Sequence, residues 1–191
     1  MKSEKGLLIV FSGPAGCGKS TVLGEYIKKR ENCMFSVSAT TRQPRAGEKD
    51  GVNYHFVTRD EFEAMLANGE MLEHTVYCGN YYGTPLKPIL TALEEGKDVL
   101  FDIEVDGAFQ VKARYPEALL IFMQPPSLEE LRARLEGRNT ETPEVIDKRM
   151  ERAETELELA EKYDYIIVND TVEEALEDLE AVIEYEHEIR N

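Results

Sequence analysis

The stretch Gly13-Pro14-Ala15-Gly16-Cys17-Gly18-Lys19-Ser20 decides the fold of this chain. The apolar run Leu7–Phe11 precedes it, and a segment with a helical pattern, Thr21–Arg30, follows it. Strand, glycine-rich loop and helix form the context in which the pattern G-x-x-x-x-G-K-[ST] acts as a phosphate-binding P-loop. The glycines allow close approaches that a Cβ would block, so backbone N–H groups can surround phosphate oxygens at a helix N-terminus. We therefore predict a nucleoside triphosphate site rather than an ordinary glycine turn.

Three side chains supply the chemistry that such a loop needs. Lys19 can reach the β- and γ-phosphates, and the Ser20 hydroxyl can bind Mg²⁺. Asp102 ends the apolar strand Val99–Ile103 and matches the acid that orients Mg²⁺ in P-loop proteins, directly or through water. The alternative, an acid that caps a helix, applies above all to Asp106.

Composition narrows the class of protein. The chain has 191 residues, of which 42% are hydrophobic, which suits one globular domain with a core. It contains no apolar run long enough for a membrane span or a signal peptide, so we expect a cytoplasmic protein that does not bind membranes. The formal charge of −16 disfavours binding to nucleic acid. Basic residues that bind an anionic ligand must therefore be concentrated locally.

The three cysteines and three histidines suggest no metal or disulfide framework. Cys17, Cys33 and Cys78 are widely spaced, and no Cys-x-x-Cys occurs. The histidines lack the spacing of metal ligands. Cys17 lies inside the phosphate loop, where a small loop residue is a better interpretation than a reactive thiol.

Apolar strand patterns alternate with helical patterns along most of the chain, which predicts βαβ units and a parallel sheet between helices. The expected strands are Leu7–Ser12, Met34–Ser38, Val99–Ile103, Leu119–Met123 and Tyr165–Val168. The expected helices are Thr21–Arg30, Leu86–Glu95, Asp106–Tyr115, Ser127–Leu135, Pro143–Tyr163 and Val172–Ile189. Ligands of such α/β folds gather at the carboxyl ends of the strands.

Two segments interrupt this alternation. Residues 38–97 contain short strand-like pieces, Val52–Val57 and Met71–Tyr77, and one short helix, Asp60–Asn68, which predicts a small α+β insertion. Residues 132–156 are rich in arginine and are expected to form a helical lid. The P-loop core then consists of residues 1–37, 98–131 and 157–191.

The insertion carries candidate binding residues for a second substrate. Arg42 and Arg45 follow a strand end and can converge on one phosphate, to which Tyr54 can add a hydroxyl contact. The alternative is an arginine pair on a surface loop. A buried Glu73 could accept two hydrogens from the edge of guanine, and Thr84 could donate to its O6. Taken alone, this second pattern is ambiguous, and the nearby Tyr81 and Tyr82 could stack, contact phosphate or belong to the core.

The lid segment carries arginines that could neutralise a transferring phosphoryl group. They are Arg132, Arg134, Arg138, Arg149 and Arg152. Glutamates alternate with them, so ordinary salt bridges along a helix are the alternative, which we favour for Arg132 and Arg152.

The order and spacing of these motifs resemble the guanylate kinase family. The most specific stretches are GPAGCGKST, SVSATTRQPRAGEKDGVNYHFV, GNYYGTP, DIEVDGA and RLEGRNTE. The resemblance covers residues 6–184 and implies an α/β P-loop fold with a nucleoside-monophosphate-binding insertion and a lid. It implies transfer of the γ-phosphoryl group of ATP to GMP, and to dGMP, in purine nucleotide metabolism, with Mg²⁺ as cofactor.

The resemblance also assigns roles to residues. For ATP it implies Gly13, Pro14, Ala15, Gly16, Cys17, Gly18, Lys19, Ser20, Thr21, Arg134 and, beside the adenine, Asn169. For GMP it implies Ser38, Arg42, Arg45, Tyr54, Glu73, Tyr82, Thr84 and Glu104. Lys19, Arg42, Arg138 and Arg149 are the expected catalytic residues, and Ser20 and Asp102 the expected metal ligands.

Two motifs depart from the family pattern, at three positions. Glu104 and Asp106 stand where the family commonly reads DIDVQGA, and Thr84 stands where serine is common. We expect guanine preference to survive with altered affinity. Two other functions remain open at this point: a guanylate-kinase-like scaffold that binds phosphopeptides, and a related kinase that acts on a sugar phosphate. The sequence is compatible with a homo-oligomer but does not determine the oligomeric state.

Overall fold

The computed structural model describes residues 5–137 and 142–190. The chain divides into two compact units. The P-loop unit comprises residues 9–31, 101–108 and 119–191, and the mixed-sheet unit comprises residues 1–8, 32–100 and 109–118. Arg138, an expected catalytic residue, lies outside the described residues.

The strands of the P-loop unit run parallel. They are β1 (Leu8–Ser12), β8 (Leu119–Gln124) and β9 (Tyr165–Val168). β8 lies between the other two, with Ile9 opposite Leu119 and Phe122 opposite Ile166. Every residue of β1 is buried, as are the apolar residues of β8. Such continuous apolar strands are typical of a parallel sheet that is covered on both faces.

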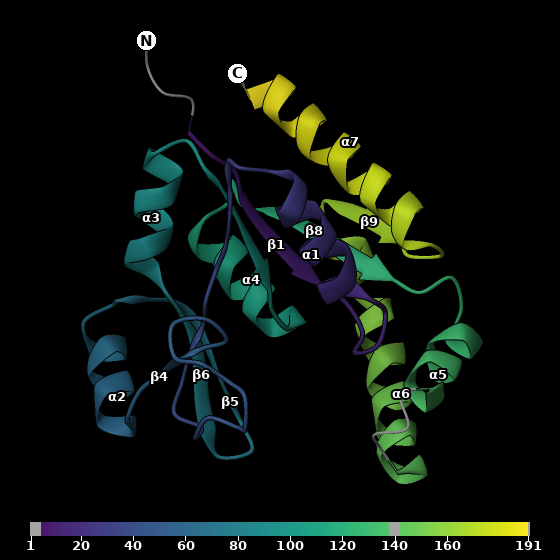
Figure 1. Ribbon diagram of the computed structural model, residues 1–191, viewed down its shortest axis with the longest axis horizontal. Helices are drawn as coiled ribbons and strands as arrows, with labels where there is room; N and C mark the ends of the chain where they lie inside the picture. Colours follow the sequence, from purple (N-terminus) through teal and green to yellow (C-terminus); the bar gives the residue numbers. More distant parts are fainter. Residues whose placement is uncertain (1–4, 138–141, 191) are drawn as a thin grey trace. The chain divides into compact units, whose positions relative to one another are not determined.

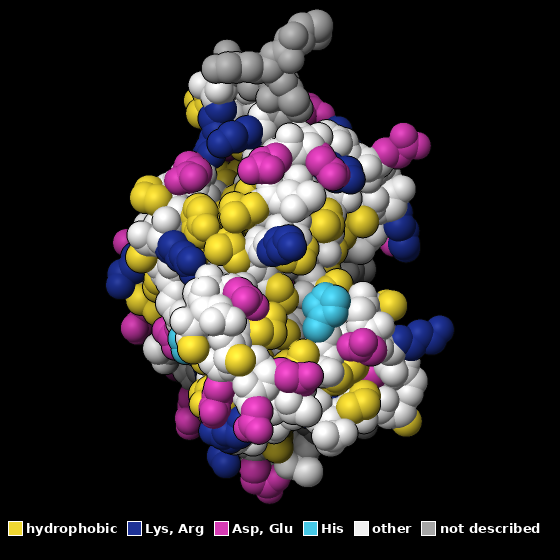
Figure 2. All heavy atoms as spheres, turned by 90° about the vertical axis from the view of Figure 1, so that its left-hand side faces the viewer, with side chains coloured by type: hydrophobic (Ala, Val, Ile, Leu, Met, Phe, Trp, Pro, Cys, Tyr) yellow, Lys and Arg dark blue, Asp and Glu magenta, His cyan; other side chains and the backbone are white. Residues whose placement is uncertain are grey.

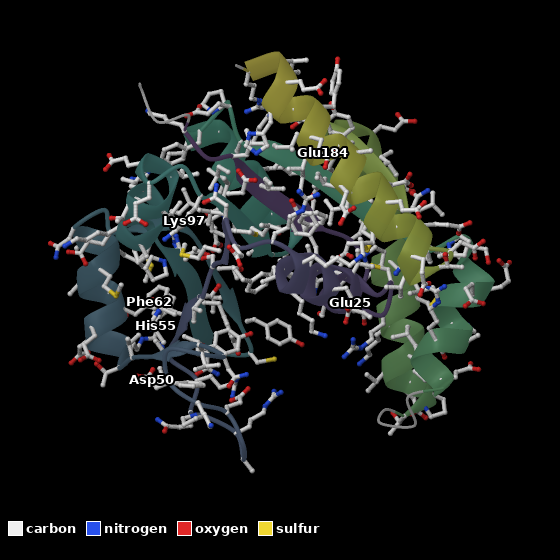
Figure 3. The ribbon with its side chains drawn as sticks, turned by 45° about the horizontal axis from the view of Figure 1, so that its top comes forward. Glu25, Asp50, His55, Phe62, Lys97 and Glu184 are labelled. Atoms are coloured by element: carbon white, nitrogen blue, oxygen red, sulfur yellow. The ribbon has the colours of Figure 1, made fainter. Side chains whose placement is uncertain are left out.

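The helices of this unit are α1 (Lys19–Lys29), α5 (Leu128–Gly137), α6 (Pro143–Glu158) and α7 (Val172–Arg190), with a short 3₁₀ turn at Ala160–Lys162. α1 lies beside α7, and α5 beside α6 (Figure 1). Arg30, which follows α1, donates to Glu184 of α7 at 3.1 Å, and Figure 3 labels Glu184 on that helix. α4 (Val105–Arg114) begins in this unit and continues into the other.

The mixed-sheet unit contains a parallel pair and a four-stranded sheet. β2 (Cys33–Phe35) pairs in parallel with β7 (Asp98–Asp102). The four-stranded sheet has the order β4-β3-β6-β5. Its strands are β3 (Ala39–Thr40), β4 (His55–Phe56), β5 (Met71–Tyr77) and β6 (Asn80–Pro85). The helices are α2 (Arg59–Ala67) and α3 (Leu86–Glu94).

The α/β class is confirmed, and the differences from the expected elements have local causes. β6 was not predicted, because Gly79-Asn80 and the glycine and proline of GNYYGTP indicate turns; the hairpin with β5 overrides those preferences. Only His55–Phe56 of the expected strand Val52–Val57 pairs with a neighbour. α6 ends at Glu158, since the chain tightens there into the 3₁₀ turn.

The mixed-sheet unit has its own small core. Thr58 and Glu61 form a capping box that starts α2. The buried ring of Phe62 then stacks on Tyr81 of β6, with ring centroids 5.0 Å apart, and packs beside Ala39. Figure 3 labels Phe62 on α2. This cluster holds α2 against the strands that carry the expected binding residues.

Charge is spread over the surface. Figure 2 shows one face on which acidic and basic side chains are interspersed with apolar ones. In residues 5–137 and 142–190, no helix is both long and apolar enough to cross a membrane.

We predict that Phe62→Ala lowers the free energy of unfolding by about 3–5 kcal/mol, because it removes a fully buried ring and leaves a cavity. Urea unfolding followed by circular dichroism measures the change. Val76→Ala on β5 is the control, since Val76 is 60% exposed and its truncation is expected to change stability by no more than about 0.5 kcal/mol. Equal losses in the two variants would show that the Phe62 cluster does not stabilise this unit.

Candidate active site

The loop between β1 and α1 has a backbone that only glycine accepts easily. Gly13, Gly16 and Gly18 have φ values of 147°, 94° and 98°. A Cβ on Gly13 would lie 2.0 Å from the carbonyl oxygen of Met123, and one on Gly18 would lie 2.2 Å from Nδ2 of Asn169. The loop therefore needs glycine for both conformation and space. It leads directly into the N-terminus of α1, where anions bind favourably.

Lys19 is held close to this loop. Its Nζ donates to the carbonyl oxygen of Gly13 at 2.5 Å and to that of Pro14 at 3.3 Å. The same nitrogen lies 3.9 Å from Oδ1 of Asp102, and its side chain is only 13% exposed. The ammonium group is thus positioned over the loop that is expected to bind phosphate.

Asp102 and Ser20 provide hard oxygen donors beside Lys19. Burial raises the pKa of Asp102, and the charge of Lys19 and a hydrogen bond with Ser20 act in the opposite direction. No cluster of three potential metal-binding side chains occurs within the described ranges. Mg²⁺ typically takes one or two carboxylates and completes its coordination with water and substrate phosphates, so Ser20 and Asp102 fit this ion.

Arg134 and Asn169 contact the loop region in a way that sequence reasoning did not foresee. Asn169 Nδ2 donates to the carbonyl oxygen of Cys17 at 2.7 Å. Arg134 Nη1 donates to the carbonyl oxygen of Asn169 at 3.0 Å, and its Nη2 to that of Asp170 at 3.2 Å. Both side chains bind protein groups here, and their expected contacts with ATP stay predictions.

The other residues of the lid region form ion pairs. Arg132 pairs with Asp147 at 2.9 Å, and Arg152 pairs with Glu104 and, at 2.8 Å, with Glu156. These contacts agree with the salt-bridge interpretation that the sequence favoured for the two arginines. Glu104, expected at the guanine, has an exposed side chain at the start of α4. Arg149 lies on α6 and is partly buried.

The arginine site of the mixed-sheet unit is built around Glu48, which sequence reasoning missed. Glu48 accepts two hydrogen bonds of 2.9 Å from the Nη1 and Nη2 atoms of Arg42, and a third of 2.7 Å from the backbone N–H of Arg45. These bonds, chiefly those from Arg42, lower the pKa of Glu48 to about 2. The guanidinium group also lies over the rings of Tyr54 and Phe56.

The donors of Arg42 show which edge remains for a ligand. Both Nη1 hydrogens are taken, by Glu48 and by the carbonyl oxygen of Gln43, and one Nη2 hydrogen goes to Glu48. The Nε–H and the second Nη2 hydrogen form the other edge of the fork, which suits bidentate binding of phosphate. Tyr82 contributes, after Glu48, to raising the pKa of Arg42, and the rings of Tyr54 and Tyr82 lie 5.9 Å apart.

Strand alternation separates the two tyrosines of β6. Tyr81 stacks on Phe62, whereas Tyr82 and Thr84, displaced by one and three residues, belong to the opposite face of the sheet. Tyr81 is therefore a core residue, and Tyr82 lies beside Arg42. Ser38, the remaining expected residue, lies just before β3 and its carbonyl oxygen accepts from the backbone N–H of His55.

Glu73 and Thr84 form a buried polar pair. Thr84 Oγ1 donates to Glu73 Oε1 at 2.6 Å. Burial raises the pKa of Glu73, and the hydrogen bond from Thr84 partly opposes this effect. The hydroxyl proton is therefore directed at Glu73, which leaves the lone pairs of Thr84 and the other carboxylate oxygen to accept hydrogens.

Comparisons with known families, sequences and structures all find similarity to the same family. The model of the family described as guanylate kinase matches residues 5–186. The guanylate kinase of Halalkalibacterium halodurans is 54% identical over 187 residues, covering 98% of this chain and 92% of the relative. The guanylate kinase of Lactococcus lactis is 54% identical over 184 residues, covering 96% of this chain and 90% of the relative. The crystal structure of guanylate kinase from Anaplasma phagocytophilum is similar, with a TM-score of 0.77 and 36% sequence identity. The similarity covers 96% of this chain and 87% of that chain.

We predict that Cys17 resists alkylation in the native protein. Its side chain is fully buried, and burial raises the pKa of its thiol, so little of the nucleophilic thiolate forms near neutral pH. Cys78 is exposed and is expected to react. Iodoacetamide labelling followed by peptide mass spectrometry measures both sites, with protein in urea as the control in which both react. Native labelling of Cys17 as fast as that of Cys78 would contradict the buried loop.

Proposed function

The chain belongs to the guanylate kinase family and is an ATP-dependent GMP kinase, and we propose that the P-loop unit binds ATP while the mixed-sheet unit binds GMP. The observation that supports this assignment is a pair of sites with oriented cationic groups, which we propose bind phosphate. One is the loop with Lys19, and the other is the open edge of Arg42 between Tyr54 and Tyr82. A GMP phosphate oxygen attacks the γ-phosphorus in line, and no protein nucleophile is needed.

The donor site neutralises the triphosphate. Backbone N–H groups of residues 13 and 15–21 surround the phosphates, and Lys19 moves its hydrogen bonds from the Gly13 and Pro14 carbonyls to phosphate oxygens. Ser20 and Asp102 would hold Mg²⁺, which would supply positive charge to the phosphates. Arg149 and Arg138 add charge as the phosphoryl group is transferred.

The acceptor site recognises phosphate and base with different groups. Arg42, Arg45, Tyr54 and Tyr82 bind the GMP phosphate. The carboxylate oxygens of Glu73 accept the N1–H and N2–H₂ of guanine, with Thr84 and Ser38 completing the pocket. None of these groups requires a ribose 2′-hydroxyl, so dGMP is also a substrate. Recycling of GMP in purine metabolism, in the cytoplasm, follows as the role.

We predict that ADP forms from Mg·ATP with GMP and dGMP and only weakly with AMP, CMP or UMP. Adenine lacks the paired N–H donors that Glu73 accepts, so its binding would bury Glu73 without the hydrogen bonds that guanine supplies. A coupled assay of ADP release measures turnover with each acceptor. Equal turnover with AMP and GMP would contradict the assigned pocket. Absence of turnover with every base would favour a binding domain or a different acceptor.

A second prediction concerns Glu48. Glu48→Gln removes a negative charge beside the phosphate site, so a purely electrostatic effect would tighten GMP binding. We expect the opposite, a rise in the KM for GMP of about tenfold, because Arg42 loses the carboxylate that orients it. Initial rates at saturating ATP measure the change.

The control for this prediction is Glu63→Gln, which removes an exposed carboxylate that pairs with Arg59 on α2. Its KM for GMP is expected to match the parent protein within about twofold, as is usual for surface pairs. A lower KM for GMP in Glu48→Gln would show that Glu48 acts only through its charge.

A further inference from the structure

Glu73 stands at an irregularity in the pairing of β5 with β6. The register of the two strands shifts by one residue between Met71 and His74. Leu72 and Glu73 of β5 therefore lie opposite a single residue of β6, Thr84. Such a β-bulge interrupts the ladder of hydrogen bonds and changes the direction of a side chain, so the main chain at Glu73 needs support from elsewhere.

Side chains of α4 supply that support along the outer edge of β5. β5 is the last strand of the four-stranded sheet, so this edge faces away from β6. Gln110 Oε1 accepts from the backbone N–H of His74 at 3.3 Å, and its Nε2 donates to the carbonyl oxygen of His74 at 3.2 Å. The side-chain amide thus makes the two bonds that a residue of a neighbouring strand would make. Arg114 Nη1 donates to the carbonyl oxygen of Met71 at 2.5 Å.

These contacts bracket Glu73 on both sides along the strand. Gln110 binds the residue after Glu73, and Arg114 binds the residue two positions before it. The two side chains are four positions apart and so share one face of α4, in the part of that helix that belongs to the mixed-sheet unit. On the β6 side, a Cβ on Gly83 would lie 2.8 Å from the carbonyl oxygen of Glu73, so β6 approaches closely. The main chain at Glu73 is therefore held between β6 and α4.

The direction of the Glu73 carboxylate matters for its proposed ligand. The residue is only 6% exposed, and its Oε1 accepts from Thr84 Oγ1 at 2.6 Å. Guanine offers two donors side by side, so both carboxylate oxygens must face the base at once. Hydrogen bonds weaken steeply as they bend, so a carboxylate that is turned keeps one bond and loses the other.

We infer that Gln110 is a positioning residue for guanine recognition, which holds the bulge of β5 so that Glu73 presents both carboxylate oxygens to the base. This inference rests on the proposed GMP site and gives Arg114 a supporting role. Its consequence is specific. Loss of Gln110 lowers the preference for a base with two donors over a base with one, whereas a general loosening of the site would weaken both nucleotides equally.

The test compares GMP with IMP, whose base keeps the N1–H of guanine and lacks the N2 amine. Calorimetric titration of each nucleotide into the parent protein and into Gln110→Leu gives the ratio of the two affinities. We expect GMP to bind the variant about tenfold more weakly and IMP to change by no more than about twofold. Gln110→Glu keeps the acceptor for the His74 N–H and removes the donor to its carbonyl. It is expected to lower the preference in the same direction, and it serves if the leucine variant does not fold.

A double-mutant cycle shows whether Gln110 acts through Glu73. Glu73→Gln replaces one of the two acceptors with a donor and is expected to lose most of the preference for GMP. Adding Gln110→Leu to this variant should then change the ratio of affinities by no more than about twofold. An equal fall in the ratio with and without the Glu73 substitution would contradict the inference.

The control is Thr91→Leu on α3, which adds an apolar side chain at an exposed helix position of the same unit and should leave the ratio unchanged. Weaker binding of GMP and IMP by the same factor in Gln110→Leu, or no change for either, would overturn the positioning role alone. Equal binding of GMP and IMP by the parent protein would contradict the proposed guanine pocket itself, and the inference with it.

Discussion

The backbone conformation of the P-loop is the constraint on which the rest of the structure depends. Gly13, Gly16 and Gly18 occupy positive φ values that side chains with a Cβ rarely adopt, so the loop can turn from β1 into α1 and present its N–H groups. Such a loop needs support, because its own backbone makes few regular hydrogen bonds. Lys19 donates to its carbonyl groups from one side, and Asn169 from another. Loop, strand and helix thus form one element, which we propose binds the phosphates of ATP.

The second constraint is charge. In a chain with a formal charge of −16, a site for a phosphate must gather cations locally. The arginine site does so with Arg42 and Arg45, yet it includes Glu48 in their midst. This carboxylate lowers the net positive charge but fixes the direction of the guanidinium edge. The arrangement favours geometry over attraction, which suits the proposed role of presenting one phosphate oxygen for attack.

The sequence predicted those parts of the site that lie within short patterns. The P-loop, Asp102 at a strand end and the pair Arg42 and Arg45 are each recognisable from neighbouring residues. The contacts that orient them were not predictable, because they join positions that no local pattern relates. Asn169 reaches Cys17 across 152 positions. Glu48 lies in the same sequence motif as Arg42 and Arg45, but only the folded loop shows that it binds Arg42. Likewise, β6 forms against the turn signals of its own residues because β5 pairs with it.

The central claim is that ATP and GMP are bound by separate sets of residues, and calorimetric titration of Lys19→Ala and Arg45→Ala tests it most directly. The account predicts that Lys19→Ala loses most of its affinity for Mg·ATP and binds GMP as the parent protein does. Arg45→Ala is predicted to show the reverse, since it removes only a cation of the arginine site. Loss of both ligands to the same extent in either variant would contradict the account.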